Sequence, residues 1–225
     1  MKIIDAHSHI DYLTHTVQSD VVGTVCCTTN CEQWDKLINI MNNDSAVYGA
    51  FGVHPWFVNA VDDNFDMQLE KLLNKNSLYM VGEIGLDKHK SDMDKQIDVF
   101  IKQFDIAIKL KRIVCLHCVG AWDKILYILK QYNPNDLPII IAHAFNENQY
   151  ITNQILKYKN IFFSFNKNCV YGGNHCIEQI PSNRILVETD GKSNVNLIDV
   201  VNQIANIKNE SDMADIIYNN TKRIL

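Results

Sequence analysis

Short apolar segments rich in β-branched residues recur along the chain and alternate with longer amphipathic segments. Near-continuous apolar runs of this length are typical of strands buried on both faces of a parallel sheet, so we expect eight strands. They are KIIDAH (2–7), VVGTVCC (21–27), AVYGAFGV (46–53), LYMVGEIG (78–85), RIVCLHC (112–118), PIIIAHA (138–144), NIFFSF (160–165) and RILVETD (184–190).

The segments between these strands predict helices. The clearest spans 94–111, where Phe100, Ile101, Phe104 and Ile108 have near-helical spacing. Similar patterns predict helices over 32–43, 65–75, 121–132, 147–158, 196–207 and 211–224. Strands mostly followed by helices predict an α/β fold, a compact (β/α)8 TIM-type barrel in a single domain over residues 1–225. A doubly wound open sheet is the alternative, but it usually has fewer strands, and no G-x-G-x-x-G follows the first one.

Composition narrows the class of protein. With 47% hydrophobic and 21% charged residues, the chain of 225 residues can bury a sizeable core. The net charge of −5 argues against a broadly basic nucleic-acid-binding surface, yet it leaves room for a metal that engages phosphates. The seven cysteines show no disulfide spacing, and there is neither a signal peptide nor an apolar run of membrane-spanning length. We therefore expect a cytoplasmic protein with no membrane contact; its oligomeric state stays open, and a monomer fits the sequence.

Six of the eight expected strands end with, or lead into, a histidine or an acidic residue. These residues are His7 and His9, His54, Glu83, His117, His143 and Asp190. In a (β/α)8 barrel the C-terminal strand ends meet at one face, where active sites form. We therefore expect these side chains to form a joint site.

The first of these motifs is DAHSHI, residues 5–10. Successive side chains alternate across a strand, so His7 and His9 point the same way, roughly 6–7 Å apart. Alone, the H-x-H pattern fits a metal ligand pair or a polar strand end equally well. The histidines and acidic residues at the later strand ends favour the metal ligand pair.

Imidazoles with two carboxylates suit Zn²⁺, Mn²⁺ or Fe²⁺ better than Mg²⁺. Six ligands exceed what one catalytic zinc uses, so we expect two divalent ions, with Zn, Mn, Fe and Mg all open.

Seven motifs, in order along nearly the whole chain, carry a family resemblance. They are DAHSHID, GVHPW, GEIGLD, IVCLHC, IAHAF, LVETD and the closing NNTKRIL. Together they resemble the TatD family of metal-dependent deoxyribonucleases, which is related to the amidohydrolases. The resemblance implies a TIM-type barrel and a two-metal-activated water that hydrolyses phosphodiesters, in the manner of a 3'-5' exonuclease on DNA.

The resemblance also implies roles for the candidate residues. One metal would be held by His7, His9, Glu83 and Asp190, and the other by Glu83, His117 and His143, with Glu83 bridging. Asp190 would orient or deprotonate the attacking water, so Asp190 and Glu83 are the expected catalytic residues. His54 of the HP motif would contact the scissile phosphate. Trp56, two residues later, is a candidate either for stacking on a base or for packing at the rim.

Three departures from the family pattern surround the expected ligands. Many members have H-S-R after the fifth strand, whereas Val119 stands here and removes an arginine that could bind phosphate. H-C-F-S-G is replaced by HAFNE (143–147), and Asp190 is followed by Gly191 and Lys192 rather than by A/S-P. The expected substrate is therefore DNA or another phosphodiester. The alternatives are an amidohydrolase-type enzyme acting on another ester, lactone or amide, and a non-catalytic metal-binding protein.

Overall fold

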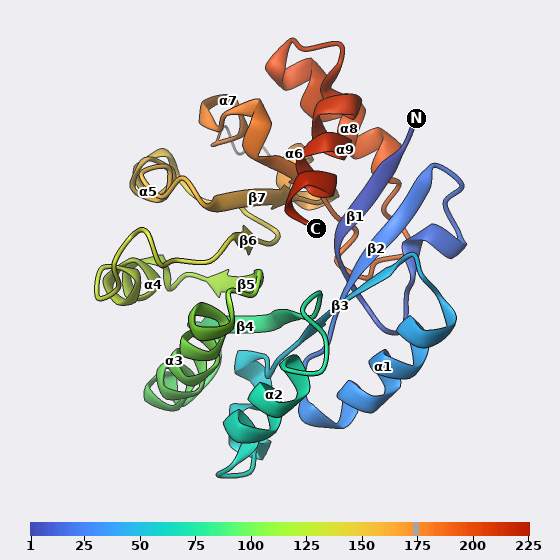
Figure 1. Cartoon of the computed structure of the whole chain (residues 1–225). Coiled ribbons are helices and arrows are strands. Elements are labelled where there is room, and N and C mark those ends of the chain that lie inside the picture. Colours follow the sequence, from blue (N-terminus) through green and yellow to red (C-terminus); the bar gives the residue numbers. More distant parts are fainter. Residues whose placement is uncertain (173–175) are drawn as a thin grey trace. The chain divides into compact units, whose positions relative to one another are not determined.

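The computed structural model describes residues 1–172 and 176–225. Across these residues eight strands alternate with helices, and the strands follow one another in a single sheet in the order β1 to β8 (Figure 1). This is the (β/α)8, or TIM-barrel, class predicted from the sequence. The strands are β1 (Ile3–His9), β2 (Val21–Cys27), β3 (Val47–Phe51), β4 (Met80–Asp87), β5 (Val114–Val119), β6 (Ile140–Ala142), β7 (Ile161–Phe165) and β8 (Ile185–Val187).

The helices follow the predicted order. They are α1 (Trp34–Asn43), α2 (Phe65–Leu73), α3 (Met93–Leu110), α4 (Trp122–Leu129), α5 (Gln149–Ile155), α6 (Lys167–Tyr171), α7 (Cys176–Gln179), α8 (Leu197–Lys208) and α9 (Met213–Ile224). A 3₁₀ segment, η3 (Pro55–Ala60), follows β3. The sequence pattern misses α6 and α7, because helices of four and five residues show too little periodicity. In the described part of the chain no helix has the length and apolarity needed to cross a membrane.

Internal contacts divide the chain into two units, which are described here one at a time. The first unit combines Met1–Cys26 with Ile141–Leu225, and the second is Cys27–Ile140. That residues 1–225 form one domain stays a prediction.

In the first unit, β7 pairs in parallel with β8, with Phe163 opposite Ile185. The C-terminal helix α9 packs on β1 and β8 and against α8. The interior is apolar: Phe145, Phe163 and Ile217 are all buried. Burying such side chains stabilises the fold by about 1.5–3 kcal/mol each.

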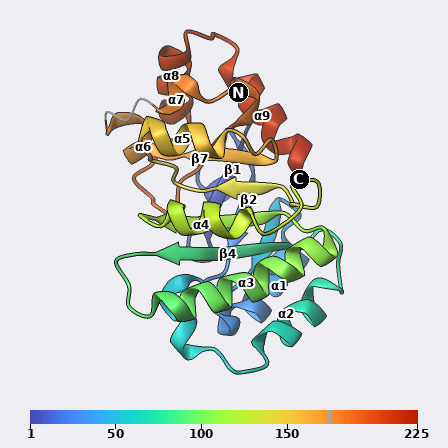
Figure 2. The ribbon, with the colours of Figure 1, turned by 90° about the vertical axis from the view of Figure 1, so that its left-hand side faces the viewer.

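In the second unit, β3 pairs in parallel with β4 and β4 with β5. Helix α3 lies along β4, as Figure 2 shows, and buries Phe100 and Phe104. Two glutamines on the same helix, Gln96 and Gln103, are also fully buried. Because a buried amide is costly unless it is hydrogen-bonded, these two side chains need backbone partners, which lie in the segments that carry the candidate site residues.

Gln103 hydrogen-bonds both backbone polar groups of Val53, the residue before His54. Its Oε1 accepts from the Val53 N–H at 2.7 Å, and its Nε2 donates to the Val53 carbonyl at 3.1 Å. Gln96 does the same for the end of β4, accepting from the Asp87 N–H at 2.8 Å and donating to the Asp87 carbonyl at 3.1 Å. Helix α3 thus fixes the backbone on which His54 and Asp87 stand.

Candidate metal centre

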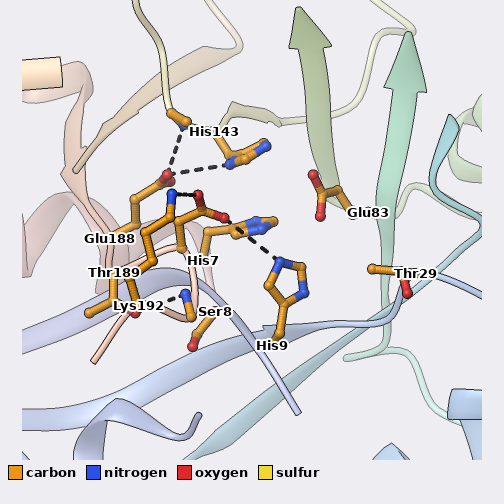
Figure 3. A network of polar contacts seen from close by, with 12 residues as sticks. His7, Ser8, His9, Thr29, Glu83, His143, Glu188, Thr189 and Lys192 are labelled. Carbon is orange, nitrogen blue, oxygen red and sulfur yellow. Dashed lines mark hydrogen bonds and ion pairs between the residues drawn. The ribbon is translucent and has the colours of Figure 1, made fainter. Parts of the chain in front are cut away.

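The first unit gathers His7, His9, His143 and Asp190, which we call the first cluster. His7 and His9 lie on the same face of β1, as the alternation predicts, with ring centroids 5.1 Å apart and nearly perpendicular planes. The His143 ring stacks on His7 at 4.0 Å, and Figure 3 shows the three imidazoles together. Ligand atoms of His7, His143 and Asp190 all lie within 4.8 Å of one another, close enough to share one ion.

Asp190 lies just beyond β8 rather than in it. Its backbone has a φ of +56°, and its N–H donates to the His7 carbonyl at 3.0 Å. Its Oδ1 is 3.7 Å from His9 Nε2, and Lys192 Nζ donates to its Oδ2. Burial alone would raise the pKa of Asp190. The His9 contact, the charges of His7 and His143 and the Lys192 ammonium instead hold that pKa well below its usual range, so the carboxylate is ionised.

Asp5 connects β1 to the segment after β8. Its carboxylate accepts from the Thr189 N–H at 3.1 Å, from the Thr189 hydroxyl at 2.6 Å and from the Thr14 hydroxyl. The side chain is completely buried, and this burial raises its pKa to about 6 although the hydrogen bonds lower it in part. Asp5 therefore supports the position of Asp190 and is not itself a ligand in the first cluster.

Glu188 contacts the Nδ1 atom of the His143 ring. Its carboxylate is completely buried, and its Oε1 lies 3.3 Å from His143 Nδ1 (Figure 3). The same oxygen accepts from the Ala144 N–H at 2.8 Å, which the left-handed φ of +46° at Ala144 directs toward it. A carboxylate on one ring nitrogen fixes the tautomer of a histidine and leaves the other nitrogen for a metal.

The second unit gathers His54, Glu83 and His117, which we call the second cluster. Glu83 and His117 come from adjacent strands, β4 and β5, and Glu83 Oε1 is 2.9 Å from His117 Nδ1. The same oxygen is 3.4 Å from His54 Nε2. All three side chains are buried. A buried carboxylate with two imidazoles is the kind of arrangement that a divalent cation stabilises.

Asp87 occupies the other side of the His117 ring. Its Oδ2 is 3.6 Å from His117 Nε2 and accepts from the Trp56 indole N–H at 2.7 Å. Burial raises the pKa of Asp87, but the hydrogen bonds from Trp56 and from the His89 N–H, with the His117 imidazole, hold that pKa below its usual range. An ionised Asp87 thus faces His117 Nε2, at a distance longer than the hydrogen bond between Glu188 and His143.

The hydrogen bond that His54 makes with its own loop decides its chemistry. Its Nδ1 accepts from the Trp56 backbone N–H at 3.2 Å, because His54 is the N-cap of η3. The neutral ring then carries its proton on Nε2, the atom that faces Glu83. In this tautomer the Nε2 atom of His54 donates a hydrogen bond and offers no lone pair to a metal.

Gly85 lets β4 and β5 approach closely at this site. It pairs with His117 in the parallel register and has a φ of +151°. A Cβ at Gly85 would lie only 1.8 Å from the His117 carbonyl oxygen. Only glycine fits here, so this position controls where the His117 backbone sits.

The donor sets fit divalent metal ions. Ligand atoms bound to one ion at 2.0–2.2 Å lie roughly 2.8–3.6 Å apart in octahedral or tetrahedral geometry, and the Glu83–His117 distance of 2.9 Å lies within that range. Buried imidazoles mixed with carboxylates are typical ligands of Zn²⁺, Mn²⁺ and Fe²⁺. The first cluster offers three imidazoles and one carboxylate, and the second, without His54, offers the His117 imidazole and the Glu83 carboxylate.

All seven candidate residues from the sequence therefore lie in one of the two clusters. His143 and Asp190 stand just past the ends of short strands rather than within them. Sequence reasoning missed Glu188 and left Asp87 without a role. The available signal was an acidic residue inside an apolar strand segment, LVETD for Glu188 and GEIGLD for Asp87.

Comparison with known proteins agrees with this chemistry. The family model for TatD related DNase matches residues 4–225. The chain is 31% identical over 170 residues to the human 3'-5' RNA nuclease TATDN2, a match that covers 72% of this chain and 22% of that protein. It is 25% identical over 209 residues to an uncharacterized metal-dependent hydrolase of Buchnera aphidicola, covering 84% of this chain and 78% of the relative. The chain thus spans only a small part of the human nuclease.

A solved structure shows the same fold. The crystal structure of YjjV, a TatD homolog from Escherichia coli, superposes with a TM-score of 0.88 at 22% identity, covering 99% of this chain and 97% of the other. The barrel fold and the histidine–carboxylate clusters define a metal-dependent hydrolase. The chain belongs to the TatD family. The predicted family, fold class and metal-dependent hydrolase activity are therefore confirmed.

Proposed function

We propose that this protein is a two-metal nuclease that removes nucleotides from the 3' ends of single-stranded DNA or RNA. The observation that carries the proposal is that each unit gathers imidazole and carboxylate groups whose ligand atoms lie within 4.8 Å of one another. The family model describes DNases, and the human relative is a 3'-5' RNA nuclease. These names support a phosphodiester substrate.

We propose two divalent ions, Zn, Mn, Fe or Mg, held by the predicted ligands. His7, His9, Glu83 and Asp190 would hold one ion, and Glu83, His117 and His143 the other. Bound there, such ions supply Lewis acidity toward a phosphoryl oxygen and a more acidic water. Glu188 and Asp87 would keep His143 and His117 in the tautomer that binds metal.

The chain's own side chains would perform the remaining steps. His54 Nε2–H would donate to a non-bridging oxygen of the scissile phosphate, because its Nδ1 is already engaged by the Trp56 N–H. Asp190, as an ionised carboxylate, would orient the attacking water or accept its proton. Lys192, which donates to Asp190, would hold the carboxylate in place. We propose that the protein acts in the cytoplasm.

Metal analysis combined with an activity assay tests this function. Purified protein would be assayed with Mg²⁺, Mn²⁺ or Zn²⁺ on single-stranded oligonucleotides labelled at either end and on bis(p-nitrophenyl) phosphate. We expect bound metal, loss of 3'-terminal nucleotides, and inactivation by chelator and by Glu83→Ala. Exposed Glu32→Ala is the matched control and should stay active. Absence of both activating metal and phosphodiesterase turnover would refute the proposal, and turnover of lactones or amides alone would favour the amidohydrolase alternative.

A further inference from the structure

Trp56 is unusual among the three tryptophans of the chain. Trp34 and Trp122 are 7% and 4% exposed, whereas Trp56 is 55% exposed. It stands in the first turn of η3, two residues after His54. An exposed indole gains less from burial than the other two do.

The Trp56 indole is held in a fixed orientation. Its N–H donates to Asp87 Oδ2 at 2.7 Å, and Asp87 Oδ1 in turn accepts from the His89 N–H at 2.8 Å. The buried Gln96 fixes the Asp87 backbone from α3. A ring that is oriented in advance loses little conformational entropy when a planar group stacks on it.

A cation accompanies the indole. Lys90 Nζ lies over the Trp56 ring, 4.2 Å from its centroid, and the Lys90 N–H donates to the Asp87 carbonyl at 3.2 Å. The Lys90 side chain is exposed. Because Lys90 covers one face of the indole, a planar base would stack on the opposite face, and the ammonium would attract the negative phosphate of the nucleotide.

The Trp56 indole lies beside His54, the residue proposed to contact phosphate. The Trp56 and His54 ring centroids are 5.2 Å apart, with edge-to-face geometry, and His54 is 4.3 Å from the His117 ring. A base stacked on Trp56 would therefore lie next to a phosphate that His54 contacts. All four side chains belong to the second unit, so this geometry is internal to it.

We propose that Trp56 and Lys90 form a stacking platform for one unpaired nucleobase adjacent to the scissile phosphate. The inference rests on the proposed function and specifies its substrate: a single strand, because paired bases have both faces covered by neighbours. Stacking accepts any base, since every base has a π face.

Intrinsic fluorescence tests the platform directly, because Trp56 is the exposed tryptophan. The metal-supplemented protein would be titrated with thymidine monophosphate, which has no phosphodiester to cleave, and with deoxyribose 5-phosphate as the base-free control. We expect thymidine monophosphate to quench the emission and to bind more tightly than the control. Trp56→Leu should remove the quenching and weaken thymidine monophosphate binding by about 5- to 150-fold, measured by calorimetry.

Further variants separate stacking from other roles. Trp56→Phe keeps an aromatic face and should retain most of the binding, Lys90→Ala should weaken it, and Tyr127→Leu, an exposed aromatic on α4, should leave it unchanged. Equal binding of the two titrants, or a Trp56→Leu protein that still prefers the one with a base, would overturn the platform. Base-dependent binding without hydrolysis of any phosphodiester would instead refute the proposed function and leave the platform standing.

Discussion

Replacing Glu188 by glutamine should weaken metal binding without unfolding the protein. Glu188 is completely buried, and its Oε1 lies within reach of three donors: His143 Nδ1, the Ala144 N–H and Asn166 Nδ2. Its Oε2 makes no hydrogen bond with the described residues. In the glutamine variant, the amide NH₂ could take the place of Oε2, where it would find no acceptor. Alternatively it could take the place of Oε1, where its N–H would face the Ala144 N–H.

The size of the effect follows from this geometry. Hydrogen bonds to a charged acceptor are roughly twice as strong as those to a neutral one, so the His143 ring becomes less basic and less firmly oriented. Loss of such a partner typically lowers metal affinity about 10- to 100-fold, or about 1.4–2.7 kcal/mol. The buried amide adds a stability cost of about 1–3 kcal/mol in the metal-free protein.

Competition with a metallochromic indicator would measure the affinity, and urea unfolding of metal-free protein the stability. Exposed Asp212→Asn, also in the first unit, is the matched control and should change neither quantity. If Glu188→Gln bound metal as tightly as the unmodified protein while its stability fell, Glu188 would have a structural role only. The support assigned to His143 would then be wrong.

Two further predictions concern the supports of the site. Gln103→Leu leaves the Val53 N–H and carbonyl without their partners, so the free energy of unfolding in urea should fall by about 2–5 kcal/mol; no loss would show that water or a rearranged backbone replaces the amide. Asp5 has its pKa raised to about 6 from an ordinary 3.8, so protonation stabilises the fold. This stabilisation is complete below pH 3.8 and is lost as the pH rises to about 6, by at most about 3 kcal/mol. Unfolding of metal-free protein across that range should show the decline, and Asp5→Asn should flatten it; equal slopes would contradict the assignment.

The strands were the most predictable elements because each is a near-continuous apolar run bounded by polar residues. Their ends were less predictable. The expected strands 138–144 and 184–190 shrink to β6 and β8, since Ala144 and Asp190 adopt positive φ that no strand continues. The backbone that presents the candidate ligands His143 and Asp190 is therefore a turn rather than a strand.

The supporting residues could not be predicted for a physical reason. A glutamine on an amphipathic helix, such as Gln103, is usually solvent-exposed, and only the packed structure shows that it pairs with a buried backbone. Glu188 and Asp87 are likewise of residue types that usually lie on the surface, so the sequence does not mark them as buried. Ligands can be recognised from a sequence by their joint pattern, whereas the groups that orient them depend on distances across the fold.

Gly85 has a consequence for how natural variation in this protein would be interpreted. Any missense change there pushes a side chain into the His117 carbonyl, although the position carries no reactive group. Even alanine, usually the mildest replacement, should behave as a loss-of-function allele. A screen that ranks substitutions by chemical similarity would classify this variant as harmless. A screen that considers the distance between the neighbouring strands β4 and β5 would classify it as damaging.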